Sequence, residues 1–340
     1  MNKSWLQSNR ISGVLVVAGA LILSGCSSSS DSAGGSAEGI REGLPANCSE
    51  ATPKIGVALP NLSNPYYVEM KKGVEEAATA AGFEAIISIA DDDIAQQQSQ
   101  IDSFIQSGVC AVYLNAIGGE PGAQFAISLS KAGIPVFAVN VFVDVAAVEA
   151  AGGSVIQQLG ADQAGGGTLS GEQALQVLGA DAKLVAGIVG VPGNLTTQLR
   201  DDAFAAALMK NPNAKVMQTV DSQVKPDVAQ KVTAEMLLGN PKMNVIFADT
   251  GPGVVGALLA IKELKREKTV ALFGFCAAIS AVPDISGAYK GCVGQEPKVY
   301  GSKTIEQIKL YITGTDVEKT LLVATPVFNQ GDSVPADVIG

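Results

Sequence analysis

Residues 54–73 read Lys54-Ile-Gly-Val-Ala-Leu-Pro-Asn-Leu-Ser-Asn-Pro-Tyr-Tyr-Val-Glu-Met-Lys-Lys-Gly73, a short apolar run followed by a helical pattern. The apolar run predicts a buried strand, and the apolar side chains three or four residues apart after it predict a helix. Asn64 stands where an N-cap belongs, and Pro65 suits the first helical position. The pair Tyr66-Tyr67 therefore lies on the first turn of a helix that follows a strand. In open α/β sheets this edge binds ligands.

The same alternation of apolar runs and helical patterns continues along the chain. Parallel strands need a crossover between them, usually a helix, so this order predicts an α/β fold with two doubly wound parallel sheets in succession. A cleft between two such lobes is a common place for a small ligand. The predicted strands are Ile55–Leu59, Glu84–Ile89, Ala111–Asn115, Val136–Val139, Ala182–Val189, Lys215–Val220, Asn244–Ala248, Thr269–Phe275, Gly291–Gly294 and Thr325–Phe328. The predicted helices are Pro65–Ala81, Ile94–Ser107, Gly122–Ala132, Gln163–Leu178, Leu195–Lys210, Asp227–Leu238, Val254–Leu264, Ile279–Tyr289 and Val299–Thr313.

The N-terminus carries an export signal. Basic residues precede the apolar stretch Ile11–Leu23, which is too short for a comfortable membrane span. The following Leu23-Ser-Gly-Cys26 resembles the lipobox of bacterial lipoproteins, in which the cysteine becomes lipidated. We therefore expect a signal peptide over residues 1–25, a lipid anchor on Cys26 and a flexible tether over residues 26–51. The folded part is expected outside the cytoplasmic membrane.

Composition excludes several functions. The chain has 33 acidic and 23 basic residues, a net charge of −10, which argues against nucleic acid or anionic lipid as a partner. It has no histidine, which excludes a histidine-based triad, general base or metal site. The four cysteines after Cys26 allow three pairings. The positions at the strand ends favour Cys48 with Cys110 and Cys276 with Cys292. No cofactor and no metal is expected.

From about Lys54 to Val327 the chain resembles the ribose/galactose-type (type I) solute-binding proteins of ABC importers. The motifs that carry the resemblance are Ile55-Gly-Val57, Asn64-Pro-Tyr-Tyr67, Gln106-Ser-Gly-Val109, Ala132-Gly-Ile-Pro-Val136, Gly256-Ala-Leu258, Phe273-Gly-Phe275 and Val293-Gly-Gln-Glu-Pro297. The resemblance implies a hinge of three crossings near Ala161, Gln295 and Thr325. It places residues 52–160 and 296–325 in lobe 1, and residues 161–295 and 326–340 in lobe 2.

The resemblance also implies a ligand site in the cleft. Its expected residues are Asn64, Tyr66, Tyr67, Asn115, Asn140, Gln198, Thr250, Cys276 and Gln295. Four of these depart from the family's charged or amide residues: Asn140 with Val141 replaces an Asp-Arg pair, Gln198 an arginine, Thr250 an asparagine and Cys276 an aspartate. Arg200, two residues after Gln198, is an alternative for the arginine. Cys276 can serve the cleft or a disulfide, and the disulfide is slightly favoured.

The sequence thus predicts a monomeric receptor, not an enzyme, that passes a small neutral sugar, sugar derivative or polyol to ABC permease subunits. A receptor for a signal such as an autoinducer-like furanose, and a binder of a less polar small molecule, remain alternatives. Gly251-Pro-Gly-Val-Val-Gly256 matches a dinucleotide-binding pattern, but no acidic residue ends the next strand to hold a ribose. A tight turn with close helix packing is therefore preferred there.

Overall fold

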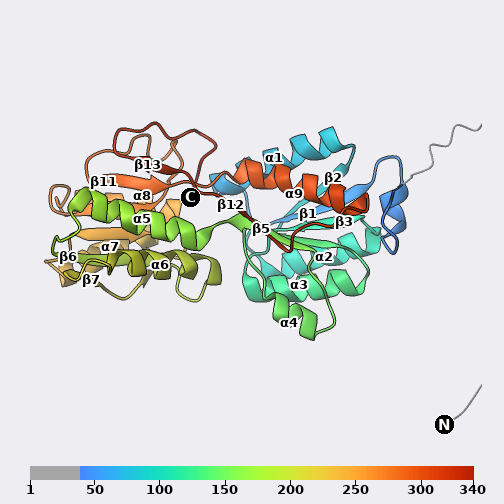
Figure 1. Cartoon of the computed structure of the whole chain (residues 1–340), viewed down its shortest axis with the longest axis horizontal. Coiled ribbons are helices and arrows are strands. Elements are labelled where there is room, and N and C mark those ends of the chain that lie inside the picture. The colour runs from blue at the N-terminus through green and yellow to red at the C-terminus, as the bar shows by residue number, and fades with distance from the viewer. Residues whose placement is uncertain (1–38) are drawn as a thin grey trace, which may run out of the picture. The chain divides into compact units, whose positions relative to one another are not determined.

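The computed structural model describes residues 39–340, which belong to one compact unit (Figure 1). Their strands form a six-stranded and a seven-stranded sheet. All strand pairs are parallel except that of β11 (Tyr289–Val293) with β13 (Val327–Asn329). The predicted fold class, two doubly wound parallel-sheet lobes, is confirmed. Lobe 1 denotes the part around the six-stranded sheet and lobe 2 the part around the seven-stranded sheet.

In lobe 1 the strand order is β12-β5-β4-β3-β1-β2. Neighbouring residues of β1 bury against opposite layers: Val57 joins the core under α1 and α9, whereas Ala58 joins the core under α2 and α3 (Figure 1). This two-sided burial explains why the strands read as continuous apolar runs. The elements are β1 (Lys54–Leu59), α1 (Pro65–Ala81), β2 (Glu84–Ile89), α2 (Ile94–Ser107), β3 (Ala111–Leu114), α3 (Gly119–Lys131), β4 (Val136–Val139), α4 (Val145–Ala150), β5 (Gln157–Ala161), α9 (Pro297–Ile312) and β12 (Thr320–Val323).

In lobe 2 the strand order is β13-β11-β10-β9-β6-β7, with β8 beside β6. Val245 and Ile246 of β9 again bury in different core clusters, one on each face of the sheet. Helices α5 and α6 pack together, as do α7 and α8. The elements are α5 (Gln163–Leu178), β6 (Leu184–Gly190), α6 (Leu195–Leu208), β7 (Ala214–Val216), β8 (Val220–Asp221), α7 (Pro226–Gly239), β9 (Val245–Ala248), α8 (Gly251–Glu263) and β10 (Ala271–Phe275), followed by β11 and β13.

Three crossings connect the two sheets. The chain leaves the first sheet after β5, returns after β11, and leaves again between β12 and β13. The second and third crossings are joined by a hydrogen bond from the Gly294 N–H to the Pro326 carbonyl, 2.7 Å. Gln295 exchanges two backbone hydrogen bonds with Ile339, both 2.9 Å, so the last residues of the sequence also lie against the second crossing.

Both expected disulfides are present, Cys48–Cys110 and Cys276–Cys292. The first ties the short 3-10 helix η1 (Ala46–Ser49) to the start of β3. The expectation of a flexible tether is wrong for residues 39–51. Ile40 and Leu44 pack against the core of lobe 1, and the Arg41 N–H donates to the Ile312 carbonyl at 2.8 Å. The predicted signal peptide and Cys26 lie outside the described residues.

The predicted helix Ile279–Tyr289 is also wrong. This segment forms turns and irregular chain, and β11 begins at Tyr289. Pro283 lacks the N–H that a helix interior needs, and Gly287 has a φ of +62°. The disulfide between Cys276 and Cys292 closes the loop that contains Pro283 and Gly287. Among the described residues, no helix combines the length and apolar character needed to cross a membrane.

Glycine allows the closest helix contacts. A Cβ at Gly73 of α1 would collide with the backbone carbonyl of Lys298 on α9, and one at Gly301 would lie 2.5 Å from the Met70 carbonyl. Likewise, Gly256 of the dinucleotide-like pattern lies directly against the first turn of α7, which agrees with the expected packing role.

We predict that Gly73→Ala lowers the free energy of unfolding by about 2 kcal/mol, because the added methyl forces α1 and α9 apart. The measurement is urea denaturation. The matched control is Gly239→Ala at the end of α7, where a Cβ meets no atom within 4 Å. Equal effects of the two substitutions would contradict the proposed close contact.

Candidate functional site

A cavity of about 90 Å³ is lined by residues of both lobes and of the second crossing. It lies beyond the carboxyl ends of the parallel strands, where helices α1, α6 and α8 begin. The lining residues are Asn64, Tyr66, Tyr67, Asn140, Val141, Asn194, Thr196, Thr197, Arg200, Val224, Thr250, Gln295 and Gly340. We call this space the central cavity.

The Tyr66 hydroxyl links distant parts of the chain at this cavity. It donates to Asn140 Oδ1 at 2.9 Å and lies 3.3 Å from Gln295 Oε1. Asn140 follows β4 with a φ of +64°, a left-handed conformation that asparagine adopts more readily than most residues. Burial raises the pKa of Tyr66 well above its usual value, so the hydroxyl stays protonated and keeps its donor.

Tyr67 stands edge-on to Tyr66, with ring centroids 5.4 Å apart. Burial, followed by the nearby charge of Asp92, raises the pKa of Tyr67 to about 12. The expected N-cap holds this first turn in place: Asn64 Oδ1 accepts a hydrogen bond from the Tyr66 N–H at 3.0 Å. The two rings therefore form an aromatic wall with neutral hydroxyl groups.

Lobe 2 contributes two helix N-termini. Asn194 caps α6 by accepting from the Thr196 and Thr197 N–H groups at 3.0 and 3.2 Å. Thr250 caps α8 by accepting from the Gly253 N–H at 3.3 Å. In both places the cap fixes a polar side chain at the cavity wall, and the helix dipoles place partial positive charge there.

Arg200 is the charged side chain of the cavity wall, and it is only 4% exposed. Its Nε donates to Gln163 Oε1 at 2.7 Å, and Nη1 donates to the Asp249 carbonyl at 2.5 Å. The guanidinium lies 3.8 Å above the centroid of the Phe275 ring. Burial lowers the pKa of Arg200, although the group stays charged. Among the described residues Nη2 has no acceptor, which leaves this donor for a ligand.

Two buried carboxyl groups accompany Arg200. Asp201 and Asp249 both approach Gly190, because a Cβ there would lie 2.6 Å from one Oδ2 and 3.0 Å from the other. Burial raises the pKa of Asp201 to about 7, and burial together with the charge of Asp201 raises the pKa of Asp249. Like charges this close disfavour double ionisation. The pair therefore retains a proton over much of the acidic range.

Six of the nine expected site residues line the central cavity: Asn64, Tyr66, Tyr67, Asn140, Thr250 and Gln295. The other three do not. Asn115 is fully buried and its amide contacts Met70 Sδ at 3.2 Å. Gln198 is exposed on α6, and Arg200 lines the cavity in its place. Cys276 is buried in its disulfide.

Sequence reasoning missed Asn194, Thr196, Thr197, Val224 and Gly340. The capping pattern before the predicted helix at Leu195 could have pointed to Asn194 and its neighbours. Gly340 could not be found this way, because its place depends on the Ile339–Gln295 pairing across the chain. Within residues 39–340, no three histidine, cysteine, aspartate or glutamate side chains are arranged to hold a metal ion.

Two parallel-sheet lobes, three crossings and a polar cavity lined by both lobes define a two-lobed solute-binding protein. A family model described as the periplasmic binding protein domain matches residues 55–316. The chain therefore belongs to the periplasmic binding protein family.

Curated relatives span most of the chain. The ribose import binding protein of Bacillus subtilis is 28% identical over 268 residues, which cover 78% of this chain and 84% of the relative. The xylitol-binding protein of Mycolicibacterium smegmatis is 27% identical over 290 residues, which cover 82% of this chain and 78% of the relative.

Solved structures show the same fold. A periplasmic solute-binding protein of an ABC transporter from Actinobacillus succinogenes with bound D-allose superimposes with a TM-score of 0.76 at 25% identity, over 82% of this chain and 98% of that one. A solute-binding protein from Bacillus halodurans with bound myo-inositol reaches a TM-score of 0.74 at 20% identity, over 83% and 96% of the two chains.

The Asp201 carboxyl predicts a pH dependence of stability. Its pKa is raised on folding, so between about pH 4 and 7 the folded state holds a proton that the unfolded state has lost, and stability falls as pH rises. Asp201→Asn removes this pH-dependent loss of stability, because asparagine does not titrate. The variant's stability relative to wild type should therefore increase over that window, by at most about 1.4 kcal/mol per pH unit, and level off above it.

The measurement is urea denaturation of both proteins at a series of pH values. The matched control is Asp284→Asn, which removes an exposed carboxyl from the loop between β10 and β11. A difference between Asp201→Asn and wild type that does not change with pH would refute the buried protonated pair.

Proposed function

We propose that this protein captures a small neutral sugar or polyol outside the cytoplasmic membrane and passes it to an ABC permease. The observation that carries the proposal is the set of polar groups around the central cavity. Amide, hydroxyl and phenol groups from both lobes stand beside a single buried guanidinium. Such groups suit adjacent hydroxyls, each of which both donates and accepts a hydrogen bond.

The ligand contacts that we propose come from Asn64, Tyr66, Tyr67, Asn140, Arg200, Thr250 and Gln295. Arg200 Nη2 can donate to a ligand oxygen, and Tyr67 offers an aromatic face to the carbon side of a ring. The relatives and solved structures described above are named for, or hold, ribose, xylitol, D-allose and myo-inositol, which are all polyhydroxylated and neutral.

Capture proceeds by hinge closure in this proposal. The lobes rotate about the three crossings, and the ligand stabilises the closed form because both lobes contact it only there. The proposed lobes comprise residues 52–160 with 296–325 and residues 161–295 with 326–340. Binding without chemical conversion fits the cavity, since the chain has no histidine to activate a nucleophile.

A calorimetric screen tests the function and its main residue. D-ribose, D-allose, xylitol and myo-inositol are titrated into the protein, and at least one should bind. Tyr66→Phe should weaken that binding at least tenfold, because the hydroxyl contact is lost and the Asn140 oxygen loses its donor.

The matched control is Tyr289→Phe, which removes another buried phenol hydroxyl at a site that does not line the central cavity. The affinity of Tyr289→Phe for the same ligand should equal that of wild type. Failure of every sugar and polyol to bind would overturn the proposed function, and equal affinities of the two variants would overturn the proposed role of Tyr66.

The motif Leu23-Ser-Gly-Cys26 supports a lipid anchor, which we propose as the means of membrane attachment. In a bacterium that processes lipoproteins, the wild type should incorporate radiolabelled palmitate. Cys26→Ser should not, because no thiol remains to be acylated. Ser27→Ala is the control and should be labelled like the wild type, and labelling of Cys26→Ser would contradict the anchor.

A further inference from the structure

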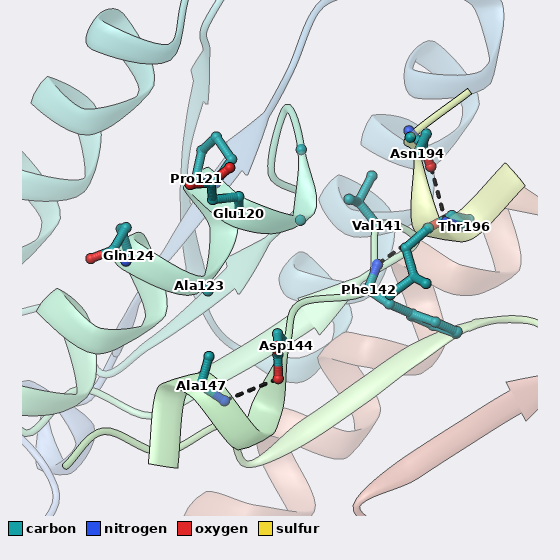
Figure 2. A pocket seen from close by; sticks show the side chains of 14 residues that line it. Glu120, Pro121, Ala123, Gln124, Val141, Phe142, Asp144, Ala147, Asn194 and Thr196 are labelled. Carbon is teal, nitrogen blue, oxygen red and sulfur yellow. Dashed lines mark hydrogen bonds between the residues drawn. The ribbon is translucent and has the colours of Figure 1, made fainter. Parts of the chain in front are cut away.

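A second cavity, of about 470 Å³, adjoins the central cavity (Figure 2). The two share Val141, Asn194 and Thr196 in their walls. At their junction the Phe142 N–H approaches Thr196 Oγ1 at 3.5 Å, a contact between the segment after β4 and the start of α6. The second cavity is several times larger than the central one, so a ligand seated centrally has open space beside it.

Three parts of the chain surround this side cavity. Figure 2 shows Glu120, Pro121 and Gln124 on the first turns of α3, Asp144 and Ala147 at α4, and Asn194 at α6. The Phe142 ring lies against Gly160 of β5, where a Cβ would come 3.1 Å from Cε1, so this part of the wall is firmly packed.

Much of the wall is apolar. Pro121, Ala123, Val141, Ala147 and Leu195 line it, and Leu195 is 55% exposed. When an apolar group covers this exposed leucine, apolar surface is removed from water, which is favourable. The side cavity therefore suits an apolar group better than another set of hydroxyls.

The charges of the side-cavity wall disfavour an anionic substituent. Its charged residues are Glu120 and Asp144, and its lining, which lies wholly in the described part of the chain, has no lysine or arginine. One Asp144 oxygen already caps α4 by accepting from the Ala147 N–H at 3.0 Å. Two carboxylates without a cation repel a phosphate or carboxylate substituent.

We propose that the side cavity receives an uncharged, apolar substituent of the ligand, so that the ligand class is a glycoside or similar sugar derivative. This inference rests on the proposed function, because the sugar part of such a ligand would occupy the central cavity. The shared residues Val141 and Thr196 mark where the bond between the sugar and its substituent would pass.

The test compares free sugars with their glycosides by titration calorimetry. The probes are D-ribose and D-allose and the methyl and phenyl β-glycosides of each. The wild type should bind a phenyl glycoside at least tenfold more tightly than the free sugar, because the ring buries the apolar wall. Ala147→Trp should abolish this preference by filling the side cavity, while the free sugar still binds.

Ala147 is exposed on α4, and its capping contact uses only the backbone N–H, so the substitution spares the fold. Leu195→Ala, which removes apolar wall instead of adding bulk, should reduce the preference as well. Ala80→Trp, at an exposed position of α1 outside both cavities, is the matched control and should keep it.

The outcomes separate the two proposals. Binding of a free sugar without any preference for its glycoside overturns the side cavity's role and leaves the proposed function standing. A preference that survives in both Ala147→Trp and Leu195→Ala also overturns it. Binding of none of the six probes overturns the glycoside class for these sugars, and with it this inference, while the wider sugar and polyol screen judges the function separately.

Discussion

Gln295 joins the hinge to the binding site. Its backbone exchanges two hydrogen bonds with Ile339, and its side-chain oxygen lies 3.3 Å from the Tyr66 hydroxyl, 229 residues away in the sequence. The same hydroxyl donates to Asn140, which directly follows β4. A group that contacts these side chains therefore touches the second crossing and the ligand edge of lobe 1 at once. This connection gives a ligand a direct physical route to the equilibrium between open and closed forms.

The buried charge at Arg200 requires an explanation, because a cavity for neutral ligands does not need one. A buried cation is costly unless it is paired and hydrogen-bonded. Here Gln163, the Asp249 carbonyl and the Phe275 ring surround it, and Asp201 and Asp249 supply opposite charge. With a proton retained by the two carboxyl groups, the cluster is close to neutral as a whole. Arg200 can thus present a strong donor without making the cavity selective for anions.

Sequence reasoning succeeded where local signals determine the structure. The helices at Pro65, Ile94 and Gln163 begin at side chains that cap them, and their predicted bounds agree with the structure. It failed where tertiary contacts decide. β5 contains glutamine and glycine in place of an apolar run, and it is a strand because β4 and β12 pair with it. In the site, one motif predicted Asn64, Tyr66 and Tyr67. That Arg200 and not Gln198 lines the cavity depends instead on which face of α6 meets α5.

Glycine contacts within each lobe bear on where motion can occur. Gly73 and Gly301 bring α1 and α9 together, Gly171 brings α5 to within reach of Phe204 and Ala207 on α6, and Gly256 brings α8 onto α7. Each pair of helices is packed backbone to backbone, so sliding one helix past the other would create collisions or voids. The crossings lie outside these helix pairs and are joined by backbone hydrogen bonds, among them the bond from Gly294 to Pro326 and the two bonds between Gln295 and Ile339. Closure of the cleft is therefore expected to use the crossings and to leave each lobe, with its half of the site, intact.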